Sequence, residues 1–133
     1  MQNDLPIYEL YAIRYAMRDA NRSEHFIGGD PHDSPMPMDY FVWLARCGDH
    51  NVLIDTGFTE VVAARRGRQF LHCPIDTLAA LGVAADTVQD IILTHLHYDH
   101  SGNFDQFTNA SFHLQEKELQ FATGKYMRHP RMS

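Results

Sequence analysis

The hydrophobic pattern of the chain alternates between short extended runs and short helical segments. Residues 7–15 alternate loosely and are rich in Ile and Tyr, which predicts an opening strand. Residues 40–44 and 51–55 are two further β-prone runs, and the Gly-Asp pair between them indicates a hairpin. Apolar runs at residues 90–93 and 111–114 predict two more strands. The chain is therefore expected to build a sheet.

Helical segments lie between and after these strands. Residues 59–66, 75–81 and 115–123 are predicted to be helical, and a glycine immediately follows each of them. A hairpin followed by alternating helices and strands predicts an α/β fold of the mixed α+β kind. In such a fold a mixed β-sheet carries its helices on the outer face.

A long loop is expected at residues 18–39, where Asn, Ser, Gly and Pro collect. It carries four large apolar side chains among its polar residues, namely Phe26, Ile27, Met36 and Met38. Two interpretations stay open, because long loops in compact domains usually have a function or lack order. The loop lies at an active-site mouth or a subunit contact, or it merely connects two strands.

Length and composition predict a single domain spanning residues 1–133. A hydrophobic content of 44% is ample for a core, and a net charge of −6 argues against nucleic-acid binding. Because the sequence shows neither a long apolar run nor a basic and apolar start, we expect no membrane span and no secretory signal. Cys47 and Cys73 are then expected to be free thiols in a cytoplasmic protein.

A dense cluster of imidazoles and one carboxylate follows the apolar run at residues 90–93. His95, His97, Asp99 and His100 lie within six residues of one another. Alternate side chains of an extended segment point the same way, so His95 and His97 can converge on one point. Imidazole and carboxylate are ligands of Zn²⁺ at neutral pH. Their density behind a rigid strand predicts a metal site rather than a histidine-rich surface turn.

The segment HLHYDH at residues 95–100 matches the HxHxDH signature of the metallo-β-lactamase superfamily. The surrounding sequence LTHLHYDHSGN most resembles the N-acyl homoserine lactonase branch, and residues 52–58 resemble the strand and turn that precede the motif. Superfamily members are αββα sandwiches of two sheet-and-helix halves. The resemblance covers about residues 8–123 and matches only the first half. It therefore implies a metallo-β-lactamase-like βαβ unit, the N-terminal half of an incomplete sandwich.

The same resemblance implies partners and cofactors. A missing C-terminal half, or another chain, is expected to complete the fold, and a homodimer is one arrangement that would do so. Two Zn²⁺ or other divalent transition-metal ions are expected, with His95 and His97 on the first and Asp99 and His100 on the second. Asp99 would also orient the attacking hydroxide or pass its proton to the leaving oxygen. Asp55 resembles the aspartate that braces the metal loop.

The implied activity is hydrolysis of a lactone or related ester by a hydroxide that two metal ions share, as in quorum-quenching N-acyl homoserine lactonases. Three alternatives remain. One is another hydrolysis of this superfamily, on a thioester as in glyoxalase II or on a β-lactam. Another is a catalytically incomplete metal-binding fragment. The third starts from Asp55-Thr56-Gly57, a triplet that aspartic proteases also present, although it leaves the histidine cluster unexplained.

Other conspicuous side chains receive structural interpretations. Tyr98, inside the motif, is expected to be a packed aromatic rather than a substrate contact. The basic residues of the cluster Arg65, Arg66 and Arg68 are expected to stabilise a helix C-terminus rather than to bind an anion. His113 and His129 lie outside any matching context, and we assign neither to the metals.

Overall fold

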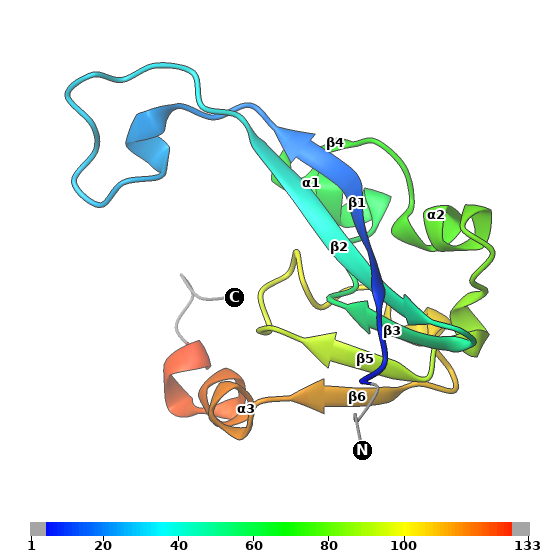
Figure 1. Cartoon of the computed structure of the whole chain (residues 1–133). Helices are drawn as coiled ribbons and strands as arrows, with labels where there is room; N and C mark the ends of the chain where they lie inside the picture. Colours follow the sequence, from blue (N-terminus) through cyan, green and yellow to red (C-terminus); the bar gives the residue numbers. More distant parts are fainter. Residues whose placement is uncertain (1–4, 129–133) are drawn as a thin grey trace.

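The two longest strands of the sheet pair antiparallel in the computed structural model, which describes residues 5–128 (Figure 1). β1 (Glu9–Arg18) pairs with β2 (Met38–Cys47), and a tight turn leads from β2 into β3 (His50–Ile54). β5 (Asp90–Leu93) runs parallel to β3, and β6 (Ser111–Leu114) runs parallel to β5. The mixed sheet and its hairpin are confirmed.

The sixth strand, β4 (Gln69–Phe70), pairs with the end of β1 and completes the order β4-β1-β2-β3-β5-β6. The sequence did not predict it, because two residues are too short to show a period. The helical elements are α1 (Glu60–Arg66), α2 (Pro74–Ala80) and α3 (Glu116–Thr123), with short 3-10 turns η1 (Arg22–Glu24), η2 (Ala85–Thr87), η3 (Phe104–Gln106) and η4 (Lys125–Arg128). All three predicted helices are therefore present.

Helix ends follow the expected local chemistry. The Thr59 side chain accepts a hydrogen bond from the Val62 amide at the start of α1, and Gly67 ends that helix with a left-handed φ of 63°. Such a residue satisfies the last helical carbonyls without the steric penalty a side chain would bring. Both ends of α1 therefore have hydrogen-bond partners for their terminal backbone groups.

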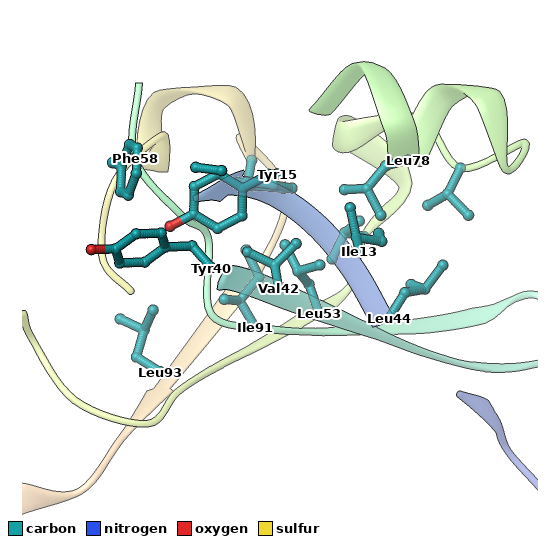
Figure 2. Close-up of a cluster of buried hydrophobic side chains, with 14 of the residues drawn as sticks. Ile13, Tyr15, Tyr40, Val42, Leu44, Leu53, Phe58, Leu78, Ile91 and Leu93 are labelled. Atoms are coloured by element: carbon teal, nitrogen blue, oxygen red, sulfur yellow. The ribbon is translucent and has the colours of Figure 1, made fainter. Parts of the chain in front are cut away.

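The hydrophobic core lies between one face of the sheet and helices α1 and α2 (Figure 2). Strand side chains such as Val42, Leu53 and Ile91 are fully buried there, and Leu78 of α2 packs onto them. At one end of this core the rings of Tyr15 and Tyr40 each meet the Phe58 ring edge to face. α3 lies beyond β6 and buries none of its residues.

The opposite face of the sheet, here called the open face, carries exposed apolar side chains. Leu10, Phe41, Trp43 and Ile92 are 70%, 37%, 45% and 42% exposed. Strand register places Trp43 beside Ile54, and Ile54 beside Ile92, so these residues form a row across the sheet. Exposed apolar side chains grouped on one face of a sheet are typical of surfaces that contact other protein.

The segment that connects β1 and β2 extends away from the sheet (Figure 1). It is held by its own polar contacts, including an Arg22–Asp30 ion pair at 2.8 Å and hydrogen bonds from Ser23 to Asp33. Phe26 and Ile27 are exposed rather than packed against the sheet. A role at an active-site mouth or a subunit contact stays a prediction.

Two further expectations concern the chain as a whole. Cys47 and Cys73 are free thiols, as predicted. Within residues 5–128, no helix has both the length and the apolar character that crossing a membrane requires.

Candidate metal centre

The candidate site forms where β3 and β5 end side by side. The segment after β5, residues 94–103, is here called the metal loop, and it lies against the turn that follows β3. Backbone hydrogen bonds join the two: Asp55 N donates to Ile92 O at 2.9 Å, and Thr56 N donates to His100 O at 2.9 Å. Backbone hydrogen bonds alone therefore hold the metal loop and the end of β5 against the turn that follows β3.

One close backbone crossing explains the glycine that follows the motif. Gly102 N donates to Gly57 O at 2.8 Å. A Cβ at Gly102 would lie 2.5 Å from that same carbonyl oxygen, closer than atoms approach without a backbone shift. Gly57 has a φ of 70° and faces the Tyr15 ring, so it too is confined to glycine. Glycine at these two positions allows the turn after β3 and the metal loop to pack closely against each other.

Asp55 is the buried brace of the metal loop. It is 4% exposed and has a φ of 62°, a left-handed conformation that aspartate tolerates better than most residues. Its carboxylate accepts hydrogen bonds from Thr94 N at 2.8 Å, Thr94 Oγ1 at 2.9 Å and His100 Nδ1 at 2.7 Å. Burial raises the pKa of Asp55, but the bonds from His100 and Thr94 outweigh burial and lower it overall. The group stays ionised and keeps its acceptors.

His100 lies between two carboxylates. Its Nδ1 faces Asp55, while its Nε2 is 3.3 Å from Asp99 Oδ2. Hydrogen bonds to Asp55 and Asp99 raise the pKa of His100 to about 9. The same bond to His100 lowers the pKa of Asp99, against the opposing effect of burial. Because His100 Nδ1 is bonded to Asp55, the other ring nitrogen, Nε2, is the one that lies near the Asp99 carboxylate.

His95 and His97 form a second donor pair. His95 Nε2 lies 3.1 Å from His97 Nδ1, and Thr94 Oγ1 lies 3.1 Å from the other nitrogen of His95. The His95 and His100 rings are 4.0 Å apart between centroids, so the two pairs are adjacent. Burial, followed by the neighbouring positive charges of His100 and His97, lowers the pKa of His95. A neutral imidazole is the form that binds a metal.

The four side chains fit a pair of incomplete metal sites. Two ligand atoms on one tetrahedral zinc lie about 3.3 Å apart, given Zn–N bonds of about 2.0–2.1 Å. The donor separations here are 3.1 Å for His95 with His97 and 3.3 Å for Asp99 with His100. Across residues 5–128, no group of three or more His, Cys, Asp or Glu side chains is arranged to hold one ion. The described residues would thus supply two ligands to each of two ions, and this assignment stays a prediction.

Residues far away in sequence support the metal loop, and sequence reasoning missed them. The Tyr15 hydroxyl donates to Asp99 O at 2.8 Å from within the core. Glu118, on α3, accepts from Leu96 N at 2.9 Å. Thr94 was also missed, although a hydroxyl residue directly before the first histidine is a visible signal. Tyr15 and Glu118 carry no local signal, because only the fold brings them to the loop.

Tyr98 is partly buried and packs against the edge of the core, as expected. Its ring stacks on Phe58 with centroids 5.6 Å apart. The Arg66 guanidinium lies 3.9 Å from the centre of the Tyr98 ring, and Arg68 Nε donates to the Tyr98 hydroxyl at 3.1 Å. The basic cluster was expected only to stabilise the helix end. Arg65 and Arg66 do lie in the last turn of α1, but Arg66 and Arg68 also hold Tyr98.

The remaining candidates lie elsewhere. His113 projects from β6 and its Nε2 is 2.7 Å from Asp90 Oδ1. His129 falls outside the described residues. The aspartic-protease interpretation needs a carboxylate available to share a proton with a second one. Both oxygens of Asp55 accept hydrogen bonds in a buried position, which favours bracing instead.

Comparison with known proteins agrees with the fold and the motif. The family model described as the metallo-beta-lactamase superfamily matches residues 36–118. This chain belongs to that superfamily. Among curated relatives, the N-acyl homoserine lactonase AttM of Rhizobium radiobacter is 27% identical over 106 residues, covering 71% of this chain and 40% of its own length.

A second relative is the acyl-coenzyme A thioesterase MBLAC2 of Bos taurus, 33% identical over 79 residues, covering 58% of this chain and 27% of its own. Among solved structures, a quorum-quenching N-acyl homoserine lactone lactonase superposes with a TM-score of 0.72 at 22% identity, covering 92% of this chain and 51% of that one. The dizinc quorum-quenching lactonase AidC superposes at 0.64 and 21% identity, covering 89% and 45%. These likenesses confirm the predicted fold. The chain spans two-fifths or less of these curated relatives and about half of the solved lactonases.

Proposed function

We propose that this chain is the metal-binding N-terminal part of a dizinc hydrolase that opens lactones of the N-acyl homoserine type. The observation that carries the proposal is the pair of adjacent donor sets, His95 with His97 and Asp99 with His100, on one braced loop. Lactonase relatives and a dizinc structural neighbour support it. Remaining ligands would come from the part of the intact protein outside this chain.

The chemistry that two divalent ions supply is activation of water and polarisation of a carbonyl group. The protein side chains supply position and proton transfer. Asp55 holds the His100 ring through Nδ1, which leaves Nε2 on the side of Asp99, where it would serve as a metal ligand. Asp99, kept ionised by His100, can take a proton from the attacking water and return it to the ring oxygen that leaves. No serine or cysteine nucleophile is required.

The open face supports the expectation that the fold is completed by further protein. Trp43 and Ile92 present apolar surface there in a chain that matches only part of its relatives. We place the remaining half of the intact protein against this face. A homodimer that covers the same surface stays a prediction.

Thioester hydrolysis is the second candidate function. The same two-metal chemistry serves a thioester carbonyl, and the relative with the highest identity of those described is a thioesterase, at 33% over 79 residues. The two functions differ only in substrate, so one assay with N-hexanoyl homoserine lactone and hexanoyl-coenzyme A distinguishes them.

The test uses the intact protein that carries this chain. Metal analysis is expected to find about two zinc or similar ions per chain, and chelation is expected to abolish lactone opening. His97→Ala should lose both metal and activity, because it removes one donor of the first pair. His113→Ala is the matched control, since His113 contacts Asp90 on the sheet rather than the donor pairs. Full activity after exhaustive chelation, or in His97→Ala, would rule the proposal out.

A further inference from the structure

Two cationic side chains meet on the ring of Tyr98, a residue of the metal loop. The Arg66 guanidinium lies over the Tyr98 ring at 3.9 Å, and Arg68 Nε donates to the Tyr98 hydroxyl at 3.1 Å. Tyr98 stands between His97 and Asp99, so it is one residue away from each donor pair. Positive charge is therefore gathered at the point where the two pairs join along the chain.

These two guanidiniums differ from the arginines of β1 and of the loop that follows it. Arg14, Arg18 and Arg22 each have a carboxylate within 4 Å, at 3.4, 3.6 and 2.8 Å. Throughout residues 5–128, no carboxylate lies that close to Arg66 or Arg68. The chain as a whole has a net charge of −6, so acidic partners are not scarce. The two positive charges are left without a counter-charge from the described chain.

The ring beneath the arginines is packed against the core. Tyr98 stacks on the fully buried Phe58, and its hydroxyl lies 3.4 Å from that of Tyr40. A guanidinium whose face rests on a ring keeps the N–H donors at its edge available. Because both arginines already contact a packed ring, a ligand that bound them would need to order less of their side chains.

We propose that Arg66 and Arg68 bind an oxyanion of the substrate, so that the preferred ester or lactone carries a carboxylate or phosphate group. The proposal rests on the hydrolase function proposed above and specifies its substrate class. Guanidinium pairs with carboxylate or phosphate through two parallel N–H···O bonds, which gives direction as well as affinity. Arg66 and Arg68 are then determinants of specificity, and the metal ligands carry the chemistry.

The experiment compares two lactones that differ in one charge. N-butyryl homoserine lactone is neutral, whereas N-succinyl homoserine lactone has the same acyl length and ends in a carboxylate. Wild-type intact protein is expected to have the higher kcat/KM for the succinyl lactone, and added salt should reduce that preference. In the double variant Arg66→Gln/Arg68→Gln, the ratio of succinyl to butyryl kcat/KM should fall about tenfold or more, mainly through KM.

Arg65→Gln is the matched control, because Arg65 is an exposed arginine of the same helix turn without a recorded contact to Tyr98. It should keep the wild-type ratio. A wild-type preference for the neutral lactone would overturn the proposal. So would an equal fall for both lactones in the double variant, since that would show that the arginines only position the metal loop.

A binding measurement separates this proposal from the hydrolase function itself. Calorimetry on metal-free protein with succinate and with inorganic phosphate should show binding to wild type and to Arg65→Gln, and at least tenfold weaker binding to the double variant. The tighter of the two probes identifies the oxyanion. If neither lactone is hydrolysed but this difference is found, the hydrolase proposal fails while the oxyanion site stands. Equal binding by all three proteins would remove the site.

Discussion

Replacing Asp55 by Asn tests how the metal loop is held. Asn is nearly the same size as Asp and also tolerates the left-handed φ of 62°, so the backbone should not change. Its amide oxygen can still accept the bonds from Thr94. Its NH₂ group would face His100 Nδ1, which now donates to the carboxylate at 2.7 Å. The strong hydrogen bond is therefore lost, because the new NH₂ group and His100 Nδ1–H are both donors and face each other.

The magnitude follows from the burial and charge of that bond. A hydrogen bond to a charged group contributes about 1.5–3 kcal/mol, and Asp55 is only 4% exposed. We expect Asp55→Asn to lower the free energy of unfolding by about 2 kcal/mol. If His100 turns its ring or changes tautomer to accept from the amide, Nε2 loses its orientation. Metal affinity should then fall about 10–100-fold.

Two assays on the intact protein measure these effects. Guanidinium denaturation of the metal-free form gives the stability, and competition with a chromophoric chelator gives the metal affinity. Asp105→Asn serves as the control, because Asp105 is an exposed carboxylate beyond the metal loop and should change stability by less than about 0.5 kcal/mol. Wild-type stability and wild-type metal affinity in Asp55→Asn would refute the reasoning. A loss of stability alone would reduce Asp55 to a packing role.

Three further predictions concern the frame around the site. Gly102→Ala should lower the free energy of unfolding by about 2–4 kcal/mol in denaturant titration, because its Cβ would lie 2.5 Å from Gly57 O; wild-type stability would contradict this. Tyr15→Phe should cost about 1–2 kcal/mol in thermal unfolding, since it removes the 2.8 Å bond to Asp99 O and leaves that carbonyl without its donor. Hydrogen bonds from two histidines lower the pKa of Asp90, so its stabilisation is complete above the unfolded pKa of about 4 and is lost as the pH falls toward the folded value. Asp90→Asn should flatten that part of a Tm-against-pH curve, and parallel curves would exclude the effect.

Most of the strands and helices could be predicted from the local pattern of the sequence. The strands at Asp90–Leu93 and Ser111–Leu114 were predicted with the bounds that the structure shows, because apolar runs bounded by polar turns leave little choice. The helix Glu60–Arg66 was likewise predicted, as residues 59–66 with a glycine at the end, and the structure adds that Thr59 caps its start. The metal loop was found from the residue types and spacing of the motif alone.

What the sequence could not reveal depends on contacts between distant segments. Tyr15 reaches Asp99 across 84 positions, and no pattern near either residue indicates that bond. Glu118 and Arg68 are similar: each reads locally as a solvent-facing charge on or after a helix. Their contacts to the metal loop exist because the sheet order places β5 between β3 and β6. Such residues can be assigned only once the topology is known.

The exposed apolar side chains of the open face, Phe41, Trp43 and Ile92 among them, have a practical consequence for work on the isolated 133-residue polypeptide. Fluorescent reporters of unfolding become bright when they bind hydrophobic surface, and this surface is available to them in the native state. A thermal-shift scan of the piece alone would therefore start with a high signal and mask its own melting transition. Circular dichroism or the intrinsic emission of Trp43 is the sounder probe, and the latter would also report when that surface becomes covered.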